Sequence, residues 1–279
     1  MSTTPRVCGV PEHFNRAWRR LADAESVAWQ EIPEGTGRML ELLENGDTDI
    51  AILLTEGAIV GAARGVPLII LGVWVESPLY WGVHVPASSA YQSADDLTPP
   101  RVAISRFGSG SHLMAGLYAK QNAWPQPVEY QVVNTLDGAR EAFSAGEADV
   151  FLWERATTAP LVTSGEFRRI DVLPTPWPCF VACCRRDQPP EIVAAYADRL
   201  HQALHKANEI ASAPDAVTQF TVEYQLATSD VERWLSETRW PDSVAATVTE
   251  MQSVADTLLE LNLIETKINA RTLLAEEST

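Results

Sequence analysis

Two segments of the chain that lie one hundred residues apart share one pattern of glycine, acidic and apolar residues. Asn45–Leu53 reads NGDTDIAIL and Ala145–Trp153 reads AGEADVFLW, so Gly46 and Asp49 correspond to Gly146 and Asp149. A glycine at this place lets a helix end in the left-handed conformation, and the apolar run after the aspartate is typical of a buried strand. Such turns also recur by chance in α/β proteins. The echo favours a duplicated helix–strand unit, one copy in each of two lobes.

Short apolar runs alternate with helical stretches along most of the chain. With 46% hydrophobic residues among 279, the chain can build a sizeable core. From Pro189 onward the pattern is mainly helical, with apolar positions spaced for packing on a lobe. The sequence therefore predicts an α/β fold with a helical C-terminal tail. The runs expected as strands are RVCGV, VAWQEI, DIAIL, PLIILGVWV, RVAIS, VEYQVV and DVFLW.

Turn-forming residues interrupt the alternation once, at SADDLTPP (residues 93–100), before RVAIS begins a new strand. We take this break as the crossover between lobes.

The charge balance restricts the possible partners. Twenty-one Lys and Arg residues stand against 37 Asp and Glu, for a formal net charge of -16. Nucleic acid and anionic membranes are poor partners for such a chain, because their binding depends on cationic contacts. The most apolar stretch, residues 66–75, is too short to span a bilayer, so we expect no membrane insertion. The first twenty residues contain no apolar core of signal-peptide length, which indicates a cytoplasmic protein, or a periplasmic one if a leader was removed.

Neither the cysteines nor the histidines have the spacing of a metal site. Cys179, Cys183 and Cys184 follow a C-x3-C-C pattern, and His201 and His205 lie four apart with no third ligand in view. We expect buried thiols, no bound metal and no cofactor.

The segment RFGSGSHLMAG (residues 106–116) lies between a predicted strand and an apolar helix. Its glycines, among them Gly110, let a ligand approach the backbone, while Ser109 or Ser111 can cap a helix whose first N–H groups favour an anion. The segment is no nucleotide loop, because no GK[ST] follows and the third glycine of the dinucleotide motif is missing. The open choice is between a site for an anionic or polar ligand and a plain capped turn, and Arg106 is expected to steady the loop.

Polar and aromatic residues also follow the other predicted strands. Because ligands of open α/β sheets bind beyond the carboxyl ends of the strands, these residues are expected to converge. The glutamates would bind a cationic group, although a loop glutamate is often only solvated. Trp177, in the extended PTPWP segment, would form an aromatic wall or pack in the core. The strand-end residues are His13, Gly35, Thr36, Gly37, Thr55, Glu56, Trp153 and Glu154.

The succession PEHF, EGTGRMLELL, GDTDIAILLTEG, VESPLYWGVH, RVAISRFGSGSHLMA, ADVFLWERATT and PTPWP resembles the type 2 periplasmic-binding-protein-like family over residues 6–187. It is most similar to the branch of nitrate, sulfonate and taurine binding proteins and thiamine-pyrimidine precursor synthases, and within it to a leaderless fungal and bacterial group. The resemblance implies two lobes, joined by two crossovers, that close on a ligand. It implies that lobe one comprises residues 1–95 and 188–279 and lobe two residues 96–187, with the ligand cleft between them. It adds Ser77 and His112 to the expected ligand-binding residues.

These observations favour a non-catalytic protein that binds a small solute, compact and polar, heteroaromatic or zwitterionic. A transporter or sensor partner is left open. The alternative is an enzyme of thiamine or pyrimidine precursor synthesis, with His13 or His112 as acid or base and pyridoxal phosphate as a conceivable cofactor. Against it, Lys120, Lys206 and Lys267 all fall in helical stretches, and the cysteine-rich CCCFC motif of the pyrimidine synthases is absent.

Overall fold

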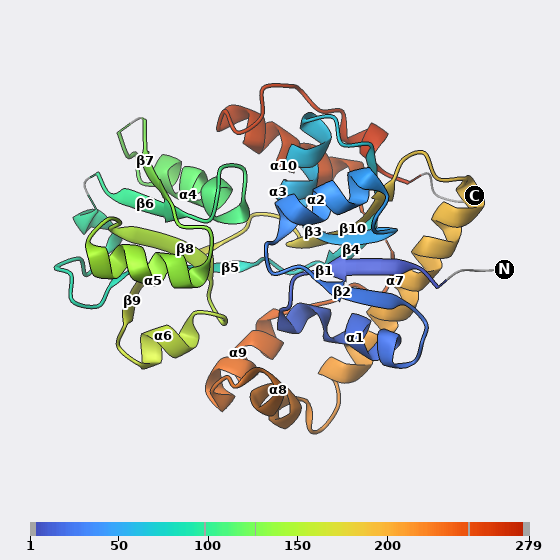
Figure 1. Cartoon of the computed structure of the whole chain (residues 1–279), viewed down its shortest axis with the longest axis horizontal. Coiled ribbons are helices and arrows are strands. Elements are labelled where there is room, and N and C mark those ends of the chain that lie inside the picture. Colours follow the sequence, from blue (N-terminus) through green and yellow to red (C-terminus); the bar gives the residue numbers. More distant parts are fainter. Residues whose placement is uncertain (1–3, 98, 126, 245, 276–279) are drawn as a thin grey trace.

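Two five-stranded sheets, one in each half of the molecule, form the framework of the protein (Figure 1). The computed structural model describes residues 4–97, 99–125, 127–244 and 246–275. We call the half built on the first sheet lobe one and the half built on the second sheet lobe two. The α/β class expected from the alternating pattern is confirmed.

The sheet of lobe one has the strand order β2-β1-β3-β10-β4. Strand β1 is parallel to β2 and β3, whereas β10 is antiparallel to β3 and β4. All eight residues of β4 are buried, as expected for a strand covered on both faces. The strands are β1 (Arg6–Gly9), β2 (Ala28–Glu31), β3 (Ile50–Leu54), β4 (Leu68–Val75) and β10 (Phe180–Arg185).

The sheet of lobe two repeats this arrangement in the order β7-β6-β8-β5-β9. Strand β6 is parallel to β7 and β8, and β5 is antiparallel to β8 and β9. In each sheet the fourth position is taken by a strand that enters from the other lobe. The strands are β5 (Tyr80–Pro86), β6 (Arg101–Ile104), β7 (Glu129–Val132), β8 (Val150–Glu154) and β9 (Phe167–Pro174).

This exchange of strands moves the lobe boundaries from the places expected. The chain crosses between the sheets at residues 76–79 and 175–179, so β5 belongs to lobe two and β10 to lobe one. The expected boundaries at 95/96 and 187/188 are therefore wrong by one strand each. The turn formers of residues 93–100 mark a loop within lobe two, because turn residues show where a strand ends but not which sheet the next strand joins.

The glycine–aspartate echo is present in the structure. Helices α2 and α5 end at Gly46 (φ 73°) and Gly146 (φ 69°), both left-handed. Asp49 accepts a hydrogen bond from the backbone N–H of Arg6 and pairs with its guanidinium, each at 2.7 Å. Asp149 and Arg101 make the same two contacts at 2.8 and 2.9 Å. Both lobes therefore begin with the same ion-paired helix–strand unit.

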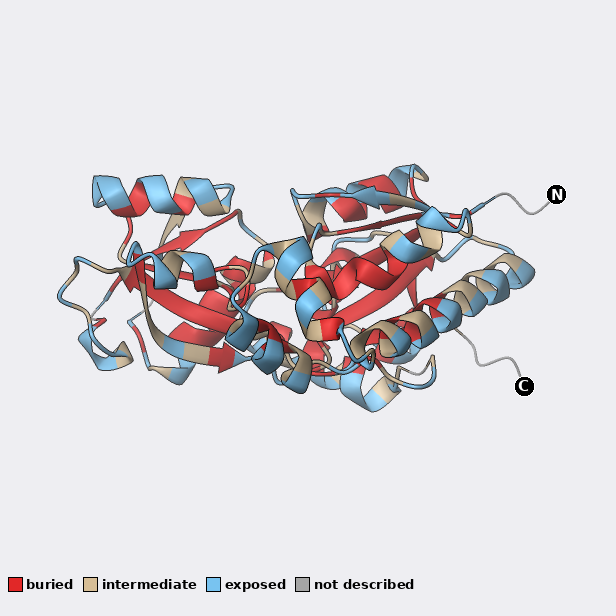
Figure 2. Ribbon diagram, turned by 90° about the horizontal axis from the view of Figure 1, so that it is seen from below, coloured by how far each residue is buried: buried red, intermediate tan, exposed pale blue. Residues whose placement is uncertain are grey.

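Helices cover the sheets on both faces, with buried inner and exposed outer surfaces (Figure 2). The C-terminal helices pack on lobe one, as the tail pattern predicted: α7 lies on β4 and α1, and α10 lies on α3. Within the part of the chain that is described, no helix combines the length and apolar character needed to cross a membrane. The helices are α1 (Arg16–Asp23), α2 (Thr36–Asn45), α3 (Thr55–Ala63), α4 (Gly110–Gln121), α5 (Leu136–Ala145), α6 (Ala159–Thr163), α7 (Pro190–Ala211), α8 (Ala216–Tyr224), α9 (Thr228–Glu237) and α10 (Val248–Glu260), with 3-10 turns η1 (His13–Asn15), η2 (Ala94–Asp96) and η3 (Ala270–Leu273).

Candidate functional site

A cavity of about 360 Å³ lies between the lobes; we call it the interlobe cleft. Its walls come from the residues that follow β1 and β2 in lobe one and β6, β7 and β8 in lobe two. Parallel strands of one sheet end at the same edge, so the loops after them gather there. The two sheets turn these edges toward each other, and the strand-end residues of both lobes meet in one cleft.

Three helices start at the wall of the cleft. Their N-cap residues are Gly35 for α2, Ser109 for α4 and Thr135 for α5, and all three line the cavity. The first N–H groups of a helix have no partner within the helix, and the helix dipole makes this end positive. Three such ends on one cavity favour a negatively charged or strongly accepting ligand group.

A cluster of hydroxyl groups and one arginine surround the start of α4. Ser109 Oγ donates to the carbonyl oxygen of Arg106 at 2.7 Å and lies 3.0 Å from Ser111 Oγ, which in turn accepts from Ser105 N–H at 2.9 Å. Among the described residues, no carboxylate pairs with the Arg106 guanidinium, and burial lowers the pKa of this side chain. Arg106 therefore brings to the cleft a positive charge that is held in no direct ion pair, although the charges of Glu41 and Glu34 act on it.

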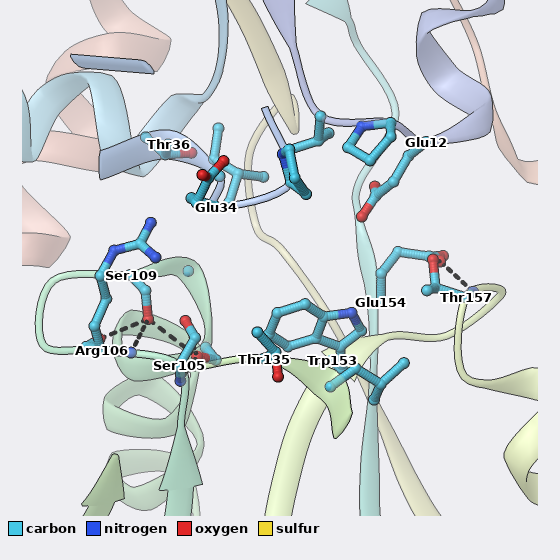
Figure 3. Close-up of a pocket in the computed structure, with 18 of the residues that line it drawn as sticks. Glu12, Glu34, Thr36, Ser105, Arg106, Ser109, Thr135, Trp153, Glu154 and Thr157 are labelled. Carbon is cyan, nitrogen blue, oxygen red and sulfur yellow. Dashed lines mark hydrogen bonds between the residues drawn. The ribbon is translucent and has the colours of Figure 1, made fainter. Parts of the chain in front are cut away.

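Arg106 also reaches across to lobe one. A Cβ atom placed on Gly37 would lie 3.0 Å from Arg106 Nε, so the glycine in the first turn of α2 leaves room for the guanidinium. Figure 3 shows Arg106 rising from the lobe-two loop toward Thr36 and Glu34. The side chain expected only to steady its loop thus lies where the two lobes approach each other.

Two carboxyl groups, one from each lobe, face the other part of the cleft (Figure 3). Glu154, at the end of β8, accepts hydrogen bonds from Ala156 N–H at 2.9 Å, Thr157 N–H at 2.6 Å and Thr157 Oγ1 at 2.8 Å. Glu12 follows β1, and its pKa is raised to about 8, first by burial and then by the charge of Glu154. This part of the cleft would stabilise a positive charge on a ligand.

Aromatic rings line the wall between these two regions. Trp153 stacks on Phe151 with ring centroids 5.2 Å apart and presents its indole to the cleft, where Trp81 and Phe180 also lie. Trp81 is 4% exposed, and its indole Nε1 has no acceptor among the described residues. A Cβ on Gly110 would come within 2.8 Å of the Trp81 ring, so the start of α4 can approach this wall only with a glycine there.

Half of the residues expected at the ligand site line the cleft. The contact between lobes brings together Gly35, Thr36, Ser109, Gly110, Ser111, Trp153 and Glu154. The other half lie outside its lining: His13, Gly37, Thr55, Glu56, Ser77, His112 and Trp177.

The two histidines are taken up by packing and by a loop. His13 is 3% exposed and packs edge-on against Trp234 at 4.3 Å, and burial lowers its pKa. His112 Nδ1 accepts from Gly108 N–H at 3.0 Å, and burial lowers the pKa of this ring as well. Each ring is therefore held by the fold, and neither residue is among those that line the cavity.

Thr55, Glu56, Ser77 and Trp177 lie together at the crossovers. Trp177 Nε1 donates to Glu56 Oε2 at 2.9 Å, and Ser77 Oγ accepts from Arg239 N–H at 3.1 Å. The two segments that cross between the lobes run side by side and place these four residues at the connection between the lobes. None of the four is among the residues that line the cleft.

Sequence reasoning missed Glu12 and Thr135 as cleft residues and undervalued Arg106. Glu12 directly precedes His13 after the first strand, and Thr135 follows the strand β7. The rule that selected the other strand ends would have found both, had it been applied to every residue of each loop.

Comparison with known proteins supports this architecture. The family model described as Ca3427-like PBP matches residues 81–173. The Candida albicans CA3427 gene product, described as exhibiting the generic periplasmic binding protein structural fold, is 23% identical with a TM-score of 0.88, covering 98% of this chain and 96% of that chain. The chain has the type 2 periplasmic-binding-protein-like fold. The predicted resemblance is therefore confirmed.

Sulfonate-binding proteins share the periplasmic-binding-protein fold of this chain. The alkanesulfonate-binding protein SsuA from Xanthomonas axonopodis pv. citri, bound to MOPS, is 19% identical with a TM-score of 0.77, covering 98% of this chain and 99% of that one. The periplasmic aliphatic sulphonate binding protein SsuA from Escherichia coli is 18% identical with a TM-score of 0.75, covering 99% and 93%. No curated protein sequence matches the chain.

Proposed function

We propose that the protein binds a small solute between its lobes, and that this solute carries an anionic group at one end and a cationic group at the other. The observation that carries the proposal is the polarity of the interlobe cleft: Arg106 and the starts of α2 and α4 lie on one side, together with the single carboxylate of Glu34, and Glu12 and Glu154 lie on the other. Binding without chemical change suits a cleft built from helix starts and indole rings.

The anionic group fits the start of α4. The N–H groups of Gly110 and Ser111 and the guanidinium of Arg106 are donors that can surround a group with several oxygens. A carboxylate offers two acceptor oxygens and a sulfonate offers three. Closure of the lobes would bring Thr36, at the start of α2, to the same group.

The cationic group fits between the two glutamates. Glu154 is fixed by its three hydrogen bonds, so it presents a preorganised negative charge. Glu12 approaches from the other lobe, and an amine between them would relieve the repulsion that raises the pKa of Glu12. The Trp153 indole offers a face for the aliphatic or aromatic part of the ligand.

The sulfonate-binding neighbours support this choice of ligand class. The Xanthomonas protein binds MOPS, in which a sulfonate is joined through a short chain to an amine nitrogen. We therefore propose an organosulfonate, or a similar acid, with an amine a few carbon atoms away. The enzyme alternative gains no support from the cleft, because His13 and His112 lie outside its lining.

Three matched probes test the proposal by isothermal titration calorimetry. 3-Aminopropane-1-sulfonate carries both groups, propane-1-sulfonate only the anion, and propylamine only the cation. We expect the aminosulfonate to bind at least tenfold more tightly than either partial probe. Arg106→Ala should weaken both sulfonates, whereas Arg271→Ala, which removes an exposed arginine of η3 that does not line the cleft, should change nothing. Absence of binding for all three probes, with no small molecule retained in native mass spectrometry, would refute the proposal.

A further inference from the structure

The two segments that connect the lobes lie side by side and are bonded to each other. We call residues 76–79 and 175–179 the hinge, because they are the places where the chain passes between the sheets. Leu79 N–H donates to Thr175 Oγ1, and Thr175 N–H donates to the Leu79 carbonyl oxygen, both at 3.0 Å. When two lobes close, the change in backbone dihedral angles is confined to a few residues at such crossings. A change in how one segment is held therefore acts on both.

The start of α3 holds the returning segment of the hinge to lobe one. Thr55 N–H donates to the Cys179 carbonyl oxygen at 3.1 Å, and Thr55 Oγ1 donates to the carbonyl oxygen of Pro178. The next residue, Glu56, accepts the indole N–H of Trp177 at 2.9 Å. Three consecutive hinge residues are thus fixed by two residues of one helix.

Of these contacts, only the one made by Glu56 depends on a proton. Glu56 is 0% exposed, and its Oε1 has no partner among the described residues. Burial raises its pKa to about 7, although its own backbone N–H and the Trp177 indole act in the opposite direction. A neutral carboxyl group can accept the indole hydrogen bond without carrying a charge. An ionised carboxylate here has only one side-chain donor for its two oxygens, and a buried charge with so few partners raises the free energy of the state that buries it.

The other titratable groups near this contact are acids. The Cys179 thiol faces Glu56 from the returning segment, and burial together with the charge of Glu56 raises the pKa of this thiol well above its usual value. Glu12 and Glu154 act on the same thiol from the cleft. None of these groups supplies a positive charge that would hold an ionised Glu56 in place.

The geometry points to Glu56 as a positioning residue of the hinge: when it loses its proton, α3 no longer holds Trp177 as it did, while Thr55 still holds the next two residues, and the balance between open and closed lobes changes. This inference rests on the lobe closure of the proposed function and not on the identity of the ligand. Phe180 and Leu79 adjoin the hinge and line the cleft, so release of the segment also moves the wall of the binding site. Glu56 and Trp177, which the sequence placed at the ligand, act on the ligand through the hinge.

Distance measurement between the lobes tests this without any ligand. Spin labels at Glu41→Cys on α2 and Glu141→Cys on α5 report the separation across the cleft by double electron–electron resonance, and the four native cysteines are buried. Between pH 5.5 and 8.5 we expect the distance distribution to change with a midpoint near 7. Glu56→Gln, which keeps an acceptor for the indole but cannot ionise, should abolish the change with midpoint near 7; the comparison is made in a Glu12→Gln background, where ionisation of Glu12 near pH 8 does not contribute.

Two further variants separate this mechanism from a structural role or from another acid. Trp177→Phe removes a donor that favours the carboxylate, so the midpoint should move to higher pH. Glu12→Gln removes the other acid with a raised pKa and should leave the midpoint near 7. A distribution independent of pH, a transition that persists in Glu56→Gln, or one lost in Glu12→Gln alone would overturn the inference. The proposed solute binding would stand in each of these cases, since the calorimetric probes test it separately.

Discussion

Glu12 of lobe one and Glu154 of lobe two face each other across the interlobe cleft, and the charge of Glu154 adds to burial in raising the pKa of Glu12 to about 8. These two acidic side chains, one from each lobe, create a negative region that a positively charged ligand group would stabilise.

The preference for an amine should depend on pH. Above pH 8 Glu12 is ionised and attracts a cation, whereas below it the carboxyl is neutral. We expect the affinity ratio of 3-aminopropane-1-sulfonate to propane-1-sulfonate to rise by about tenfold between pH 6.5 and 9, since one unit of pKa shift corresponds to a factor of ten. Any effect of the hinge on binding is the same for both probes, so it cancels in the ratio of their affinities. A ratio that does not vary with pH, or that varies equally in Glu12→Gln, would contradict the assignment of Glu12.

Ser109 should matter for both stability and binding. Its side chain accepts from His112 N–H at the start of α4, so Ser109→Ala is expected to cost about 1 kcal/mol in the free energy of unfolding. The hydroxyl also donates to the carbonyl oxygen of Arg106 and so fixes the loop that carries the guanidinium, and its loss should weaken propane-1-sulfonate about fivefold, the equivalent of one ordinary hydrogen bond. Thr247→Ala is the matched control, because Thr247 caps α10 away from the cleft. Urea denaturation and calorimetry on both variants should show equal stability losses but a binding loss only for Ser109.

Glu56 should make the stability of the protein decrease as the pH rises. Its pKa is raised from 4.5 to about 7 in the folded protein, so the stability linked to its proton is fully present below pH 4.5 and is lost as pH rises through 7. Relative to Glu56→Gln, the wild-type protein should therefore lose about 3 kcal/mol between pH 4.5 and 8. Chemical denaturation at several pH values measures this difference, and parallel pH profiles of the two proteins would show that Glu56 is not the group concerned.

The two helix-ending glycines should respond alike to substitution. Gly46 and Gly146 have φ of 73° and 69°, and an added Cβ would meet nothing within 4 Å at either place. Gly→Ala at each site should therefore cost about 1 kcal/mol from backbone conformation alone, and Gly→Asn less. Thermal unfolding of the four single variants tests this. A much larger loss at one site would show that the two units differ in more than sequence position.

Local chemistry made part of this protein predictable. The buried strand β4, the left-handed turns at Gly46 and Gly146, and the cap of α4 by Ser109 each depend on residues within a few positions of one another. The convergence of strand ends also followed from a general property of parallel sheets. Arg106 could be located on its loop in the same way, but not its approach to Gly37, which lies in the other lobe.

The sequence by itself determined the α/β class, the repeated unit and the strand-end loops from which the cleft is built, because strand propensity, helix caps and turn residues act over short distances. Only the tertiary structure decided which of those loop residues reach the cleft. Strands β5 and β10 exchange between the sheets, and this exchange brings Glu56 and Trp177 to the hinge while leaving Glu12 and Glu154 opposite each other. Pairing between distant strands is set by the packing of the whole core, so it cannot be inferred from any short segment of the chain.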